Sequence, residues 1–323
     1  MTLCYALPLI SLFYGCSTST QNANIAITDD PQYAMRQIAG NQLRVYGNDE
    51  KVLLRNIKEA KRQYAKITQT LSGNIAKRWS KEDITLPSAQ VYVKYSNEYK
   101  TRVSVNFATG AIRIESIDGV NTLEKAIVNT LLMSQNPNHM DLYSSGDVEI
   151  KGKPFLAGLV KDNEGEDILS SWRAQKYAKY LITNALKTRN DERGKLVNYV
   201  DLQMVGDYQS KSEHKYEAIV QKYAHKYNVP PALVLGIIQT ESNFNPYAVS
   251  GAPAYGLMQI VPSTAGADAY ELINGKKGMP TKEMLFDPET NIHYGVAYLS
   301  ILFNRYLPDV KNKQSQEYCV IAA

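Results

Sequence analysis

One glutamate stands where its surroundings could turn it into a proton donor. In the stretch PALVLGIIQTE, Leu233, Ile237 and Glu241 follow at a spacing of four, so an α-helix would place the carboxyl on the same face as two apolar side chains. Burial disfavours the ionised carboxylate and raises its pKa, which a general acid near neutral pH requires. A glutamate at a helix end can instead turn back to solvent, and the residues that follow bear on that choice.

The segment after Glu241 is polar and irregular. It combines hydrogen-bonding side chains with the glycines and prolines that interrupt regular structure, namely Ser242, Asn243, Asn245, Ser250, Gly251, Pro253 and Gly256. Because a loop of this composition follows the acid, we expect a polar groove beside Glu241 and not a glutamate that merely turns back to solvent at a helix end.

The same residues carry a family resemblance. From Glu241 to Ala265 the chain reads ESNFNPYAVSGAPAYGLMQIVPSTA, which closely resembles the motif of the soluble-lytic-transglycosylase family with its goose-lysozyme-like fold. The run NIHYGVAYL at 291–299 resembles the family's next helix. Further upstream, YVKYSNEYKTR and VNFATGAIRIE resemble the N-terminal domain of one membrane-bound branch, so the resemblance covers nearly all of residues 90–323.

This resemblance implies an activity and a set of site residues. The activity is cleavage of the β-1,4 bond between N-acetylmuramic acid and N-acetylglucosamine in peptidoglycan, leaving a 1,6-anhydro end. Glu241 would be the acid and base, and no metal or cofactor is implied. A single carboxylate suffices because the 6-hydroxyl of the substrate is the second nucleophile. The implied substrate contacts are Ser242, Ser250, Tyr255, Met258 and Gln259.

Two other functions remain open from the residues alone. A hydrolytic lysozyme would need a second carboxylate to hold an attacking water, and the nearby candidates are Asp268, Glu271, Glu283, Asp287 and Glu289. A non-catalytic peptidoglycan-binding lipoprotein would keep the groove without turning substrate over.

The last residues predict an incomplete catalytic domain. The family continues with a Tyr-Asn motif after a segment like the one at 318–323, where this chain stops. We therefore expect the apolar face of the last long helix to lack part of its cover. That face comprises Ile292, Val296, Leu299 and Phe303.

The elements that must position the site fall into two groups. Residues 49–80 favour a long helix, VYVKY at 91–95 reads as a strand, and TRVSVNF and AIRIESI predict an antiparallel hairpin around Ala108-Thr109-Gly110. Helices are expected at 123–133 and 171–187, and a strand at LVNYVDLQMV. Helices and antiparallel strands without βαβ regularity predict an α+β domain.

From about residue 206 the pattern becomes entirely helical. Tyr216, Val220, Tyr223 and Tyr227 recur at spacings of four, three and four, which places them along one helix face. Asp287-Pro288 is a capping acid followed by proline and predicts the start of the last long helix. The sequence thus predicts an α+β domain over 31–205 and an all-α domain over 206–323, and the family resemblance implies that the second domain is lysozyme-like.

The beginning of the chain predicts export and a lipid anchor. Residues 3–15 are apolar apart from Ser11, which is the length of a signal-peptide core and short of the ~20 residues that span a bilayer. The run ends at Gly15-Cys16, which resembles a lipobox, although no Lys or Arg occurs before Arg36. We expect a signal peptide over 1–16, lipidated Cys16, a polar linker over 17–30, and attachment to the periplasmic face of the outer membrane. The alternative is a buried N-terminal segment with an inert cysteine.

Composition limits the partners. The 36 basic and 32 acidic residues give a net charge of +4, and the basic residues are spread along the chain without zinc-finger spacing. We therefore expect no nucleic-acid partner. The 23 tyrosines suit half-wet grooves that hold sugars, because tyrosine combines an apolar face with a polar tip. The expected partners are glycan strands and a membrane reached through the lipid.

Overall fold

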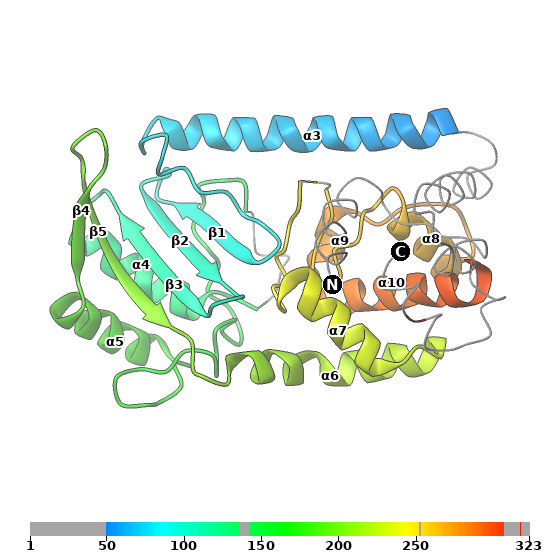
Figure 1. Cartoon of the computed structure of the whole chain (residues 1–323). Helices are drawn as coiled ribbons and strands as arrows, with labels where there is room; N and C mark the ends of the chain where they lie inside the picture. The colour runs from blue at the N-terminus through cyan, green and yellow to red at the C-terminus, as the bar shows by residue number, and fades with distance from the viewer. Residues whose placement is uncertain (1–49, 136–141, 252, 307–316, 318–323) are drawn as a thin grey trace, which may run out of the picture. The chain divides into compact units, whose positions relative to one another are not determined.

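A computed structural model of the chain describes residues 50–135, 142–251, 253–306 and 317. The described chain forms two compact units that do not follow sequence order (Figure 1). One unit contains residues 64–216 and 241–249. The other contains 217–240 and the described residues from 250 onward, with those before residue 64. The predicted signal peptide, linker and Cys16 lie outside the described residues.

A five-stranded antiparallel sheet forms the centre of the first unit, and it confirms the α+β fold class. Its strand order is β1-β2-β3-β5-β4. The predicted hairpin is confirmed, because Val105 pairs with Ile112 and Val103 with Ile114 in the β2–β3 register. The strands are β1 (Val91–Ser96), β2 (Thr101–Asn106), β3 (Ala111–Ser116), β4 (Lys187–Asn190) and β5 (Leu196–Gln203).

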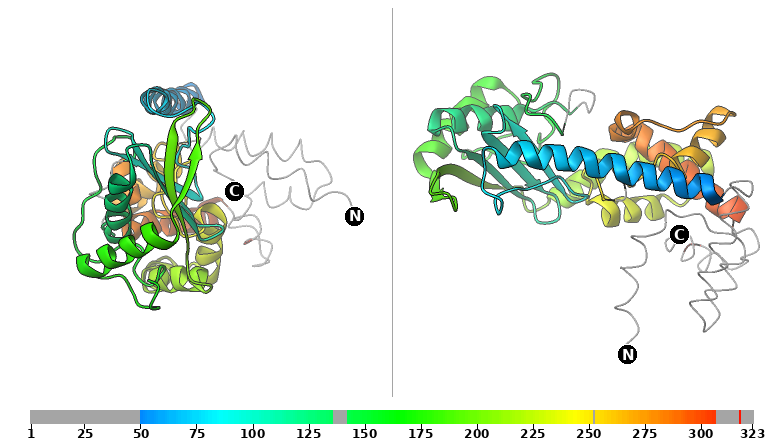
Figure 2. Two further views of the ribbon diagram at one scale, coloured as in Figure 1. Left: turned by 90° about the vertical axis from the view of Figure 1, so that its left-hand side faces the viewer. Right: turned by 90° about the horizontal axis from the view of Figure 1, so that it is seen from above.

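Two helices pack in this unit beside the sheet. Helix α4 (Val120–Leu132) lies against β2, β3 and β5, and α5 (Ser171–Asn184) packs on α4 (Figures 1 and 2). The Ser170 side chain caps α5 by accepting from the Arg173 backbone N–H. Helix α5 ends earlier than the sequence pattern predicted, because Lys187 already begins β4.

The end of the long helix α3 (Glu50–Ala76) closes the core of this unit. Leu71, Ile75 and Trp79 pack with Val93 and Tyr95 in one buried cluster. The Trp79 ring nitrogen donates to the Tyr99 carbonyl at 2.6 Å. The long helix predicted over 49–80 is therefore confirmed, although it ends at Ala76, and its last turns belong to the same apolar core as the sheet.

The sheet also carries a buried ionic network. Arg102 donates from Nε to Glu115 at 2.7 Å, and Arg189 bridges Glu115 and Asp83. The Glu115 side chain is 1% exposed. Buried charges need this kind of pairing because each isolated ion would pay a large desolvation cost.

The helical part of the chain agrees with the predicted pattern. The helical domain comprises α6 (Tyr208–Tyr227), α7 (Pro231–Ser242), α8 (Ala265–Asn274), α9 (Lys282–Phe286), α10 (Pro288–Ile301) and a π-helical turn (Leu302–Tyr306). Asp287 caps α10 by accepting from the Thr290 N–H at 2.8 Å, with Pro288 in the first turn. Tyr216, Val220 and Tyr223 are buried along α6, as expected.

One expectation about α10 was wrong. Ile292, Val296 and Leu299 were expected to lack cover, yet all three are buried, and only Phe303 is half-buried. Leu285 and Phe286 of α9 are buried as well, and α10 packs against both α8 and α9. The neighbouring helices α8 and α9 therefore contribute to the cover of this helix.

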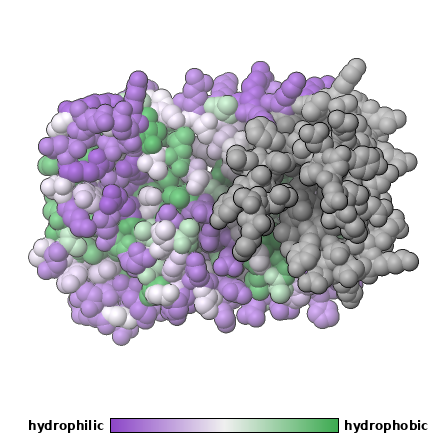
Figure 3. Space-filling model, in the orientation of Figure 1, coloured by the Kyte–Doolittle hydropathy of each residue, from purple (hydrophilic) through white to green (hydrophobic). Residues whose placement is uncertain are grey.

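Hydrophilic side chains cover much of the described surface. Figure 3 shows smaller hydrophobic areas between them on the face that it draws. Among the described residues, no helix is both long and apolar enough to cross a membrane.

Candidate functional site

Helix α7 brings Glu241 to the edge of a buried face. The residues that this helix buries are Val234, Ile238 and Ser242, again at a spacing of four. Leu233 and Ile237 are only half-buried, so the expectation that they form the core stripe with Glu241 was wrong by one position. One residue turns an α-helix by about 100°, which leaves Glu241 beside the buried face and open to solvent.

The position of Glu241 suits proton transfer. Its side chain is exposed, and the protein atoms packed around the carboxyl nonetheless raise its pKa above the ordinary glutamate value. Partial desolvation penalises the charged form, whereas the open side leaves the group within reach of a ligand. Glu241 can therefore hold a proton at a higher pH than a fully solvated glutamate.

The other predicted site residues differ in how accessible they are. Ser242 is completely buried, and Tyr255 and Met258 are 9% and 6% exposed. Ser250 and Gln259 are partly exposed. Ser250 and Gln259 are therefore the more accessible members of this set.

Residues 255–260 form a closed turn. Tyr255 and Ile260 exchange both backbone hydrogen bonds, at 3.1 and 3.0 Å. Gly256 has a φ of +73°, and a Cβ there would stand 2.2 Å from the Leu285 carbonyl oxygen. Only glycine fits this close approach of two backbone segments. Gln259 also lies in the left-handed region, with a φ of 46°.

Asn291 on α10 holds that turn in place. Its side chain is fully buried and makes three hydrogen bonds of 2.8 Å: Oδ1 accepts from the Met258 N–H, while Nδ2 donates to the carbonyls of Tyr255 and Leu285. The sequence places Asn291 in the run that resembles a family helix but does not predict this bonding role. Its type and its spacing of four from Gly295 were the available signals, because the two residues then share one helix face.

The absence of a side chain at Gly295 makes room for the thioether of Met258. A Cβ at position 295 would lie 2.2 Å from the Met258 Sδ, so the thioether rests directly on the bare backbone of α10. Asn291 thus binds the backbone of Met258, and Gly295 makes room for its side chain.

Gln259 has one unused polar atom. Its Nε2 donates to the Gly256 carbonyl at 3.0 Å. Its Oε1 is buried and has no hydrogen-bond partner within the described part of the chain. An unpaired buried acceptor is uncommon in folded proteins.

Several of the carboxylates considered for a hydrolytic mechanism have structural roles instead. Asp287 caps α10, and Glu289 pairs with Lys222 at 2.6 Å and accepts from the Tyr223 hydroxyl at 3.0 Å. Asp268 on α8 differs, because burial raises its pKa to about 6. It lines a separate hollow of about 390 Å³ with Leu272, Ile301 and Arg305.

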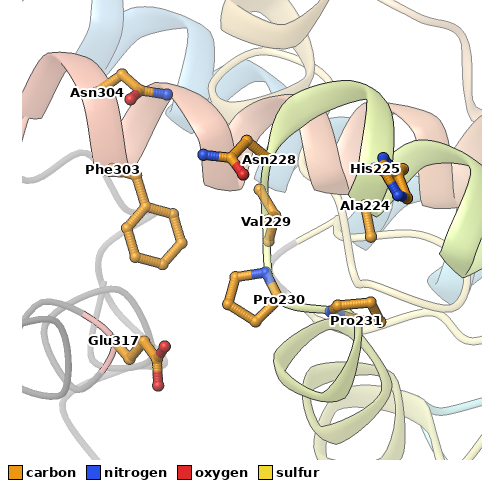
Figure 4. Close-up of a pocket in the computed structure, with 9 residues that line it drawn as sticks. All are labelled: Ala224, His225, Asn228, Val229, Pro230, Pro231, Phe303, Asn304 and Glu317. Carbon is orange, nitrogen blue, oxygen red and sulfur yellow. The ribbon is translucent and has the colours of Figure 1, made fainter.

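A further hollow lies at the corner between α6 and α7 (Figure 4). Pro230 and Pro231 form one side, Phe303 and Asn304 face them, and the volume is about 410 Å³. None of the predicted site residues lines it. Across the described residues, no group of three His, Cys, Asp or Glu side chains is arranged to hold a metal ion.

Comparison with known proteins identifies relatives over most of the chain. Residues 54–215 match the family model "Membrane-bound lytic murein transglycosylase C, N-terminal domain", and residues 218–323 match "Transglycosylase SLT domain". Proteins named membrane-bound lytic murein transglycosylase C from Yersinia pestis strain Pestoides F and Yersinia pseudotuberculosis strain IP 31758 are each 45% identical over 254 residues. The match covers 77% of this chain and 70% of each relative.

Proposed function

The chain belongs to the membrane-bound lytic murein transglycosylase C family, and from this premise we propose that Glu241 is its catalytic acid and base. The protein is an enzyme, a lytic transglycosylase that acts on peptidoglycan. The single observation that supports Glu241 most directly is that the residue reaches the surface while desolvation of its carboxyl raises the pKa.

In the proposed reaction, Glu241 first gives up a proton and then takes one back. The protonated carboxyl gives its proton to the glycosidic oxygen as the bond from that oxygen to the anomeric carbon of N-acetylmuramic acid breaks. The 6-hydroxyl of the same sugar then attacks the anomeric carbon and returns its proton to the carboxylate. The products are a free 4-hydroxyl on N-acetylglucosamine and a 1,6-anhydro end, and no water, metal or cofactor takes part. Holding the hydroxyl near its own anomeric carbon makes this step intramolecular.

The turn at 255–260 is proposed to contribute binding groups. Gln259 offers a partly exposed amide side chain to a sugar hydroxyl or amide group, and Ser250 is a second accessible polar contact. Met258 and Tyr255 are buried members of the same turn, and Ser242 is the buried residue that directly follows the acid in the last turn of α7.

Product analysis tests the assignment of Glu241. Glu241→Gln keeps the size of the side chain but removes the titrating group, so we expect activity to fall by about 10² to 10⁴. The parent should form anhydro muropeptides, and its rate should decline as the pH rises through the raised pKa of Glu241, because the acid form is then lost. Glu217→Gln on α6 is the exposed control and should retain the parent rate.

Mass spectrometry of the digest also separates the alternatives. Ordinary reducing ends would indicate a hydrolase, and no new ends would indicate a binding protein. A Glu241→Gln variant that forms anhydro ends at the parent rate would remove Glu241 from the mechanism.

We further propose that the enzyme is anchored by lipid on Cys16, at the periplasmic face of the outer membrane. The apolar run before Gly15-Cys16 supports this, as do the words "membrane-bound" in the names of the relatives. Because one acyl chain binds a membrane only marginally, stable attachment would require more than one. Labelling with a clickable fatty acid should mark the parent and Cys4→Ser but not Cys16→Ser. Equal labelling of all three would refute the anchor.

A further inference from the structure

The compact unit built around the sheet contains a segment that begins at Glu241. Residues 241–249 belong to this unit, whereas residues 217–240 and the described residues from 250 onward belong to the other. We propose that the α+β unit positions the catalytic acid by holding the turn that follows it. This inference rests on the proposed role of Glu241 and assigns a task in catalysis to the sheet and the residues packed around it.

The turn after Glu241 has a backbone conformation that needs support. Asn243 and Phe244 have φ angles of 48° and 62°, so two consecutive residues other than glycine lie in the left-handed region. Such conformations persist only where the surrounding structure over-determines them. Helix α7 ends at Ser242, directly before this pair.

Backbone groups that lead into β1 supply part of this support. The Asn245 side chain is fully buried, and its Nδ2 donates to the Ala89 carbonyl at 3.0 Å. Its Oδ1 accepts from the Tyr247 N–H at 3.0 Å, so the same side chain also closes the turn. The Val249 N–H donates to the Ser88 carbonyl at 3.4 Å.

Aromatic packing supplies the rest. Tyr247 is 1% exposed, and its ring centroid lies 5.6 Å from that of Tyr92 on β1 and 5.4 Å from that of Phe155. Phe244 stacks in parallel with Tyr216 at 6.4 Å. Edge and stacked pairs at these separations fix ring orientation as well as bury area.

These contacts lie within a few residues of the acid along a continuous backbone. A movement of Asn245 or Tyr247 would be transmitted through the constrained Asn243–Phe244 pair to the last turn of α7, which carries Glu241. A displacement of about 1 Å at a reacting group can cost about a hundredfold in rate. Asn245, Tyr247 and Phe155 are therefore positioning residues in this proposal.

The test compares two buried phenylalanines of one core in the full chain. Phe155→Leu removes a ring that contacts Tyr247. Phe107→Leu removes a ring whose centroid lies 5.8 Å from that of Phe155, and Phe107 is not one of the three positioning residues. With purified peptidoglycan as substrate, we expect Phe155→Leu to lower kcat by roughly ten- to a hundredfold with little change in KM. Phe107→Leu should keep the parent kcat at a similar cost in stability.

Asn245→Asp provides a second, independent variant. It removes the donor to the Ala89 carbonyl and keeps the acceptor for the Tyr247 N–H, and it should lower kcat in the same range even if Phe155→Leu does not fold. Parent-like kcat in a folded Phe155→Leu, or in Asn245→Asp, would overturn the positioning role. Equal losses in Phe155→Leu and Phe107→Leu would do the same, because a general effect on folding would then explain both. A parent that forms anhydro ends and an inactive Glu241→Gln would show in each case that the proposed function itself stands.

Discussion

The Oδ1 of Asn291 accepts a hydrogen bond of 2.8 Å from the backbone N–H of Met258, a residue that lies far from it in the sequence. The same amide donates to the carbonyls of Tyr255 and Leu285. One buried side chain thereby ties the turn at 255–260 to the first turns of α10 and to the end of α9. The conformation of the proposed binding turn depends on this amide.

Replacement of Asn291 should cost both stability and activity. Asn291→Ala leaves an N–H and two carbonyls buried without their partner, and each such group costs about 1 to 3 kcal/mol. Asn291→Asp keeps the acceptor but places an oxygen against two carbonyl oxygens, so it should be no milder. Urea unfolding should show a loss of at least about 3 kcal/mol for Asn291→Ala.

The control is Asn304→Ala, which removes an exposed bond to the Ser300 carbonyl within one helical segment. An exposed substitution of this kind usually changes stability by less than about 0.5 kcal/mol. Equal effects at positions 291 and 304 would contradict the role of Asn291 as the tie between the turn and the helix.

The two glycines of the site should respond differently to alanine. At Gly256 the new Cβ would meet the Leu285 backbone oxygen at a residue with positive φ, and neither can yield, so we expect a loss of more than about 2 kcal/mol. At Gly295 it would meet the Sδ and Cε of Met258, the end of a flexible side chain that can move away. Gly295→Ala should therefore cost less stability and chiefly raise KM.

A double-mutant cycle tests whether the cost of Gly295→Ala comes from its contact with Met258. If the cost of Gly295→Ala comes from Met258, it should shrink in the background of Met258→Ala. The same cost in both backgrounds would show that the Cβ disturbs something else.

His293 should make the stability of the helical part depend on pH. Its ring stacks on Tyr223 at 4.2 Å, and its Nε2 lies 2.8 Å from the Tyr227 hydroxyl. Burial, followed by the charges of Lys226 and Lys222, lowers its pKa to about 4. Between pH 6.5 and 4 the unfolded chain therefore binds a proton that the folded chain does not, and stability falls as the pH falls through this window.

The size of that loss is about 1 to 3 kcal/mol, since one pKa unit corresponds to about 1.4 kcal/mol. Urea unfolding at a series of pH values should show the slope in the parent. His293→Phe keeps a ring on Tyr223 and should flatten it, whereas the exposed His225→Phe should not. An unchanged slope in His293→Phe would assign the pH dependence to other groups.

Local pattern was enough to predict most elements. The alternation of TRVSVNF and AIRIESI identified the hairpin because one face of each strand is buried, and Asp287-Pro288 identified the start of α10 because cap and proline act within one turn. The pattern predicted the wrong buried face of α7, because two sets of residues with the same spacing lie one residue apart in that helix. Leu233, Ile237 and Glu241 have the same spacing as Val234, Ile238 and Ser242, and periodicity in an almost wholly apolar helix does not distinguish between the two faces.

The amino-acid sequence by itself determined the α+β and helical classes, the family, and the identity of the candidate acid, because these depend on residue types and short spacings along the chain. Only the tertiary structure decided how the site is held. Asn291 and Gly295 come to Met258 from another helix, and Ala89, Tyr92 and Phe155 come to the turn after Glu241 from the sheet unit. Contacts between residues so far apart in sequence leave no periodic trace, since they depend on how whole elements pack and not on the residues beside them.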